Sequence, residues 1–186
     1  KKVVSNEEVK KALESKSRRS SKYNDAYNKM IRQGDIIIST DGFKVGQING
    51  LTIAVAGDCS FGQPVRITAN TYIGKSGVLN IEREVSMSGT THSKGVYILS
   101  AYIGEKYAQE VPLSLTASLC FEQLYNPVDG DSASSTELYA ILSSLSGVPI
   151  NQSLAVTGSV NQKGEIQPIG GVTDKIEGFY KVCKEK

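Results

Sequence analysis

The spacing of the apolar residues changes at Asp35, and this change restricts the possible folds more than any other feature of the sequence. Before it, apolar positions recur at helical intervals: a capping box at residues 5–8 opens one short basic helix, and a second covers residues 22–33 with Gly34 as its stop. After it, β-branched residues alternate with polar ones in short runs bounded by Gly, Asn or Asp. These runs cover residues 36–38, 44–45, 51–56, 66–73 and 77–82. We therefore expect two helices followed by hairpins that form one sheet.

The second half of the chain predicts helices and strands in alternation. The expected helices cover residues 92–110, residues 132–146 with Gly147 as the stop, and the segment after Gly170-Gly171. The expected strands cover residues 111–121, 154–160 and 165–169. The last helix carries Ile176, Phe179, Tyr180 and Cys183 at helical spacing. The predicted fold class is α+β, tending to mixed α/β, with N-terminal β-hairpins and a sheet followed by alternating helices and strands.

Two glycine-marked junctions place a serine and a lysine at the entrances of helices. Ser132 follows Asp129-Gly130-Asp131, so its hydroxyl would project near unpaired backbone N–H groups that favour negative charge. A developing oxyanion would be stabilised there. Lys175 lies at the start of the last helix, where the helix dipole opposes protonation of an ammonium group. Together they indicate a serine nucleophile with a lysine base, a pair that needs no histidine.

Three stretches carry a family resemblance: VDGDSASSTELYAILSSLSGVPI, LAVTGS and GEIQPIGGVTDKIEG closely resemble the proteolytic domain of Lon proteases, in the B-type and related branch. The resemblance runs from about Lys44 to the C-terminus. It implies a serine endopeptidase with a Lon-like fold, in which Ser132 is the nucleophile and Lys175 the general base. By the same resemblance, Thr157 is a hydroxyl partner of the lysine and Asp129 is a neighbour of the site.

The resemblance also implies a division of the chain. Residues 1–40 look like the end of the helical lid of an AAA+ ATPase module and its linker, and residues 41–186 look like the proteolytic domain. The family has a further strand after the last helix, so we expect this domain to be truncated at its C-terminus. The natural protein would then carry an upstream AAA+ module that uses ATP and Mg, form a homo-oligomer that we expect to be a hexameric ring, and cleave unfolded or misfolded proteins threaded into its chamber. The sequence contains no GxxxxGK[ST] loop, so we expect no ATPase activity and no cofactor in this fragment.

Several alternatives stay open on the residues alone. Ser132, His92 and Asp129 have the residue types of a Ser-His-Asp triad, and Cys59 or Cys120 could in principle be a nucleophile. A carboxylate such as Asp129 next to Lys175 would favour the charged ammonium, so a salt bridge between them would be an inactive resting arrangement. The chain could also be a catalytically silent Lon-like binding or assembly module.

Composition narrows the class of protein and its expected location. With 39% hydrophobic and 22% charged residues, the sequence is typical of a globular protein, and no run approaches the roughly 18 apolar residues of a membrane span. Three widely spaced cysteines and one histidine support neither a disulfide framework nor a zinc site, so a reducing cytoplasm is the expected location. Residues 1–33 hold ten Lys or Arg against four Asp or Glu. Such a basic arm could bind nucleic acid, but it lacks aromatic and Gly interleaving, and we expect no nucleic-acid partner.

Overall fold

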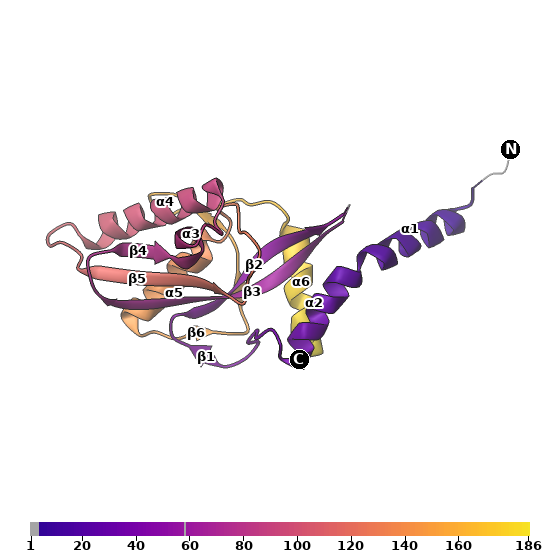
Figure 1. Cartoon of the computed structure of the whole chain (residues 1–186), viewed down its shortest axis with the longest axis horizontal. Coiled ribbons are helices and arrows are strands. Elements are labelled where there is room, and N and C mark those ends of the chain that lie inside the picture. The colour runs from indigo at the N-terminus through magenta and orange to yellow at the C-terminus, as the bar shows by residue number, and fades with distance from the viewer. Residues whose placement is uncertain (1–3, 58) are drawn as a thin grey trace.

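A five-stranded mixed sheet forms the centre of the molecule (Figure 1). The computed structural model describes residues 4–57 and 59–186, without the side chains of residues 17–20. The strands lie in the order β4-β5-β3-β2-β7. Their bounds are Gln47–Ala56 (β2), Cys59–Ile73 (β3), Gly77–Asn80 (β4), Leu115–Glu122 (β5) and Ala155–Val156 (β7). Strand β3 pairs antiparallel with β2 and β5, whereas β4 and β7 run parallel to their neighbours.

Two short strand pairs lie outside this sheet. Strand β1 (Phe43–Lys44) pairs with β6 (Ile150–Asn151), and β8 (Ser159–Val160) pairs with β9 (Ile166–Gln167). Of the N-terminal strands expected to form one sheet, β2, β3 and β4 do share the five-stranded sheet, whereas β1 does not. The helices are α1 (Asn6–Ser20), α2 (Lys22–Gln33), α3 (Ile81–Glu84), α4 (Thr90–Tyr107), α5 (Ser134–Ser146) and α6 (Val172–Glu185). Helices combined with a mixed sheet confirm the predicted α+β class.

The main core lies between the sheet, α4 and α5. Helix α4 contributes Val96, Leu99 and Ile103, and α5 contributes Leu138 and Ile141, all of them fully or almost fully buried. These residues recur every three or four positions, so each helix presents one apolar stripe to the sheet, as the spacing predicts. Figure 1 shows α4 running along the edge of the sheet that β4 forms.

The strand expected over residues 77–82 ends early, at Asn80. The side-chain Oδ1 of Asn80 accepts a hydrogen bond from the Arg83 amide at 2.9 Å and caps the single-turn helix α3. This turn directs the carboxylate of Glu82 inward, where it accepts a bond from the Phe121 amide at 2.8 Å. A side-chain cap therefore replaces a strand that the alternation of residues favoured.

A second, smaller core joins the N-terminal helices to the last helix. Ile31 of α2 and Val182 of α6 are buried together with Ile36 and Ile38, which lie in an irregular segment and not in the expected strand. Two of the apolar residues that α6 carries do not belong to this core, because Ile176 and Tyr180 are 60% and 62% exposed. The residues of α6 that are buried are Lys175, Gly178 and Val182.

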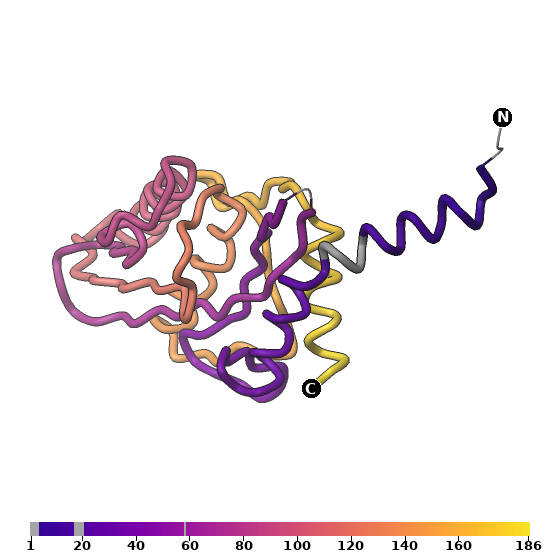
Figure 2. Tube along the Cα trace, turned by 45° about the vertical axis from the view of Figure 1, so that its right-hand side comes forward, coloured from indigo at the N-terminus to yellow at the C-terminus, as the bar shows by residue number. Residues whose placement is uncertain are grey.

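Helix α1 projects away from the rest of the molecule, as Figures 1 and 2 show. The predicted capping box is confirmed, since the Ser5 amide donates to Glu8 Oε2 at 2.7 Å and the Glu8 amide donates to Ser5 Oγ at 3.3 Å. Val9 and Leu13 are 47% and 62% exposed, so the apolar face of this helix is open. Helix α2 ends at Gly34 in the left-handed conformation, as predicted.

Candidate active site

Ser132 lies in a tight turn that leads into α5. Its carbonyl oxygen accepts two hydrogen bonds, from the Gly158 amide at 2.7 Å and from the Thr157 hydroxyl at 3.1 Å. One turn further on, the Ser135 amide donates to the Gly158 carbonyl at 3.0 Å. The backbone around Gly158 is therefore paired with the turn and not with a neighbouring strand. This explains why the strand expected over 154–160 is split into β7 and β8, with Thr157 in the gap.

Lys175 reaches the same place from α6. The helix begins after Gly171, which adopts the left-handed conformation at φ 67°. Gly62 of β3 lies directly against the backbone of Asp174 and Lys175, and Gly178 of α6 lies directly against the carbonyl of Gly62, so a Cβ at either glycine would overlap with backbone atoms. Two glycines at this crossing allow the helix to pack on the strand at backbone distance, which brings the Lys175 side chain into the interior.

The side chains of Lys175, Ser132 and Thr157 meet. Lys175 Nζ lies 2.9 Å from Ser132 Oγ and 3.0 Å from Thr157 Oγ1. Lys175 is only 3% exposed. Burial lowers the pKa of its ammonium below the ordinary value for lysine, and the negative charge of Asp131 partly opposes this effect. A lowered pKa at a group in contact with a serine hydroxyl is typical of a site that activates a nucleophile.

Asp129 does not join this group. Its Oδ1 accepts from the amides of Thr91 and His92 at 3.1 and 3.2 Å, so the carboxylate caps the N-terminus of α4. Hydrogen bonds from the backbone of Gly130 and His92, with that of Thr91, hold the pKa of Asp129 below its usual range. Within the described part of the chain, no ion pair joins Asp129 to Lys175.

The carboxylate whose charge acts on the pKa of Lys175 is that of Asp131, a residue that the sequence analysis did not single out. Its Oδ2 accepts from the Ser159 hydroxyl at 2.8 Å, and its backbone carbonyl accepts from Ser134. The position of Asp131 next to Ser132 was a usable signal. Gly158 was also missed, because its role in holding the turn is a contact of backbone with backbone.

The alternative nucleophiles and bases lie elsewhere. His92 is bonded through Nε2 to Glu137 and through Nδ1 to Ser88, so its ring is engaged away from Ser132. Burial, with the nearby charges of Glu82 and Glu122, raises the pKa of the Cys120 thiol to about 11, which disfavours the thiolate that a cysteine nucleophile needs. Cys59 and Cys183 are free thiols as well.

The described residues contain neither a cluster of metal-ligating side chains nor a membrane-spanning helix. Within residues 4–57 and 59–186, no three His, Cys, Asp or Glu side chains gather in a way that could hold a metal ion. None of the helices in these residues is long and apolar enough to cross a lipid bilayer.

The fold and the site together define an α+β domain in which a buried lysine contacts a partly buried serine at the entrance of a helix. Residues 118–182, which contain both members of the pair, match the model of the Lon protease (S16) C-terminal proteolytic domain. The chain belongs to the Lon protease family through this domain, and membership supports peptidase activity.

Relatives are found in bacteria and archaea. A provisionally named Lon protease homolog of Escherichia coli K12 is 44% identical over 158 residues, which are 84% of this chain and 27% of that protein. Its counterpart in Haemophilus influenzae is 38% identical over 81% of this chain and 26% of its own length. An archaeal Lon protease of Archaeoglobus fulgidus is 33% identical over 79% of this chain and 23% of its own length. The chain thus spans about a quarter of the length of these relatives.

Proposed function

We propose that the chain is the serine endopeptidase domain of an ATP-dependent protein-degrading machine, with Ser132 as nucleophile and Lys175 as general base. The observation that carries the proposal is the contact of 2.9 Å between Lys175 Nζ and Ser132 Oγ, made by a lysine that is 3% exposed. A serine hydroxyl is a poor nucleophile until a neighbouring group accepts its proton, and a lysine with a lowered pKa can do so near neutral pH.

Thr157 fixes the direction of this proton transfer. Its hydroxyl donates to the Ser132 carbonyl oxygen, so its oxygen is left to accept an N–H bond from Lys175. A neutral lysine amine has two N–H bonds and one lone pair. With one N–H directed at Thr157, the lone pair can face Ser132 Oγ and accept its proton.

The proposed reaction follows from this arrangement. Ser132 Oγ attacks the carbonyl carbon of a peptide bond while its proton passes to Lys175 Nζ. The resulting ammonium gives the proton to the nitrogen of the leaving amine as the C–N bond breaks, which leaves an ester on Ser132. Lys175 then takes a proton from water, the hydroxide attacks the ester, and Oγ recovers its proton as the acid product departs.

Backbone amides at the turn are available for the oxyanion. The amides of Ser134 and Ser135 are already bonded to the carbonyls of Asp131 and Gly158. Among the described residues, those of Ser132 and Ala133 have no hydrogen-bond acceptor and lie at the entrance of α5. We assign the stabilisation of the developing negative charge to these two amides.

The rest of the machine is proposed from the family. In the full-length protein we expect an upstream AAA+ module that binds ATP and Mg, a homohexameric ring, unfolded or misfolded proteins as substrates, and a cytoplasmic location. This fragment should need no cofactor of its own, and it should hydrolyse no ATP.

The test is hydrolysis of casein without ATP by the chain and by Ser132→Ala and Lys175→Ala, from neutral to alkaline pH. Activity that rises with pH and is lost in both variants supports the pair. Lys181→Ala is the matched control, because Lys181 lies on the same helix but pairs with Glu177. Labelling of Ser132 by a fluorophosphonate gives a second readout. A chain that neither hydrolyses casein nor reacts with the probe would favour a silent module, and activity that survives both substitutions would disprove the mechanism.

A further inference from the structure

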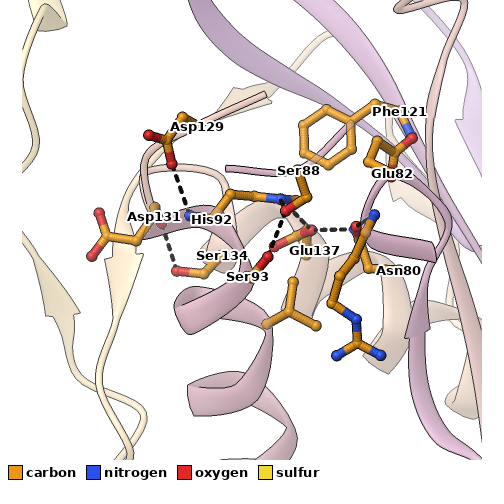
Figure 3. Close-up of polar contacts among 12 residues, drawn as sticks. Asn80, Glu82, Ser88, His92, Ser93, Phe121, Asp129, Asp131, Ser134 and Glu137 are labelled. Carbon is orange, nitrogen blue, oxygen red and sulfur yellow. Dashed lines mark hydrogen bonds and ion pairs between the residues drawn. The ribbon is translucent and has the colours of Figure 1, made fainter. Parts of the chain in front are cut away.

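A network of buried polar side chains lies behind the candidate site, between α4, α5 and the β4 edge of the sheet (Figure 3). Its centre is His92 of α4, which is 1% exposed. Its Nε2 lies 3.1 Å from Glu137 Oε1 on α5, and its Nδ1 lies 2.8 Å from Ser88 Oγ. Glu137 Oε1 also accepts from Asn80 Nδ2 at 3.1 Å. Nothing in the proposed chemistry uses these residues.

His92 contacts the chain on both sides of Ser132. Its backbone amide donates to Asp129 Oδ1, three positions before the serine, and its ring bonds to Glu137, five positions after it. The turn between these two points packs closely on α4, since Gly95 leaves only 3.3 Å between an added Cβ and the Asp131 side chain. One residue of α4 therefore fixes both the loop that enters the serine turn and the helix that leaves it.

Because Glu137 is buried, loss of its hydrogen bond to His92 would be strongly destabilising. Glu137 is 0% exposed, and its second oxygen has no hydrogen-bond partner in the described part of the structure. Without His92, a buried carboxylate would keep only the Asn80 amide as a partner, and α5 would have to shift to hydrate it. Burial by itself lowers the pKa of His92, but the hydrogen bond to Glu137 and the charges of Glu137, Glu82 and Asp129 outweigh it and raise this pKa above the ordinary value.

We propose that His92 and Glu137 form a positioning pair that holds Ser132 in register with Lys175. The effect of this pair on catalysis rests on the proposed function, whereas its effect on the position of the serine turn does not. The pair touches neither the substrate nor the reacting atoms. It acts by locking α4 to α5, so that the turn carrying Ser132 has a single position relative to α6.

Two amide substitutions separate the two sides of the histidine ring. His92→Gln places an amide nitrogen near the position of Nε2 and can still donate to Glu137, whereas His92→Asn reaches only the Ser88 side. We expect His92→Asn and Glu137→Ala each to lower kcat on a peptide substrate about ten- to a hundredfold, because small misplacements cost that much. KM should change by less than about threefold, since substrate binding is not altered. His92→Gln should recover most of the loss.

The control is Gln152→Ala, which removes another fully buried polar side chain. The side-chain amide of Gln152 bonds to Gln47 and Ile150 and, in the described part of the chain, makes no hydrogen bond with residues 129–137. It should lower the melting temperature without lowering kcat. The double variant His92→Asn/Glu137→Ala should lose no more activity than either single variant, because the two residues act as one unit. Wild-type kcat in His92→Asn, or additive losses in the double variant, would overturn the proposal.

Hydrogen exchange tests the pair independently of activity. The amides of Ser134 and Ser135 donate to the carbonyls of Asp131 and Gly158. Their exchange rates should rise in His92→Asn and should match the wild-type rates in His92→Gln and Gln152→Ala. Unchanged exchange in His92→Asn would refute the positioning role even in a chain that cleaves nothing. Conversely, hydrolysis that survives Ser132→Ala would refute the proposed function and leave the exchange result standing.

Discussion

At the scale of single residues, the hydroxyl of Thr157 determines which way the Lys175 amine points, and this can be tested directly. Thr157→Val keeps the shape and removes the oxygen that accepts from Nζ at 3.0 Å. We expect kcat to fall about tenfold or more because the lone pair loses its orientation toward Ser132. Thr157→Ser keeps the oxygen and should retain most activity. Steady-state kinetics of both variants provide the measurement. Equal kcat values for Thr157→Val and Thr157→Ser would contradict the role of the Thr157 hydroxyl in orienting Lys175.

The charge of Asp131 should be visible in the pH dependence. Because this carboxylate stabilises the Lys175 ammonium, it raises the pKa that burial lowers. Asp131→Asn removes the attraction and keeps an acceptor for Ser159, so the lysine pKa should fall further and the rising limb of kcat/KM should move to lower pH. Asp174→Asn is the control, since Asp174 precedes Lys175 but bonds to Ser60. A limb that stays in place in Asp131→Asn would exclude this electrostatic role.

The His92–Glu137 pair should give a pH-dependent contribution to stability. The folded-state pKa of His92 is raised, so its contribution is complete below the ordinary histidine pKa and is lost as pH rises through the folded-state value. The difference in unfolding free energy between the wild type and Glu137→Gln should therefore be largest below the ordinary histidine pKa of about 6.5 and shrink as pH rises through the raised folded-state pKa. Urea unfolding at several pH values measures it. A difference that does not vary with pH would mean that the bond is not an ion pair.

At the scale of elements, the crossing of β3 and α6 depends on two glycines. Alanine favours a helix by about 1 kcal/mol over glycine, so Gly178→Ala should stabilise the chain if only helix propensity mattered. We expect the opposite, because its Cβ would overlap with the Gly62 carbonyl and push α6 off the strand. Activity should fall together with stability, since Lys175 lies on the same helix. Gly104→Ala in α4 is the matched control, with no atom within 4 Å of the added Cβ. Thermal unfolding and casein hydrolysis of both variants decide the question.

Elements with strong periodicity were predictable, and contacts between elements were not. The apolar stripe of Val96, Leu99 and Ile103 placed α4 within a few residues. The pairing of Ser132 with Lys175 came from their glycine-marked junctions and from the family resemblance. The buried face of α6 could not be read from hydropathy, because a lysine and a glycine occupy it while Ile176 and Tyr180 are exposed. The break at Thr157 was missed because it arises from backbone bonds to a distant turn, which alternation of residues does not encode.

At the scale of the whole molecule, the two N-terminal helices should contribute unequally to stability. Removing residues 1–20 should change the melting temperature little, because Val9 and Leu13 are exposed. Removing residues 1–34 should lower it by about 5 °C or more, since burial of an isoleucine such as Ile31 stabilises by about 1.5–3 kcal/mol and each kcal/mol corresponds to about 2–4 °C. Differential scanning calorimetry of both truncated chains measures this. Equal melting temperatures would mean that the core formed by α2 and α6 adds nothing.

The attachment of α2 to α6 has a mechanical consequence. Ser132 is fixed to α4, α5 and the backbone at Gly158, whereas Lys175 lies on a helix held by β3 and, through Ile31 with Val182 and Arg32 with Glu185, by the N-terminal helices. A force applied along α1 would reach the lysine before it reached the serine. A displacement of the N-terminal helices, which Figure 1 shows beside α6, would change the separation of the pair, because Lys175 would move with α6 while Ser132 stays with α4 and α5.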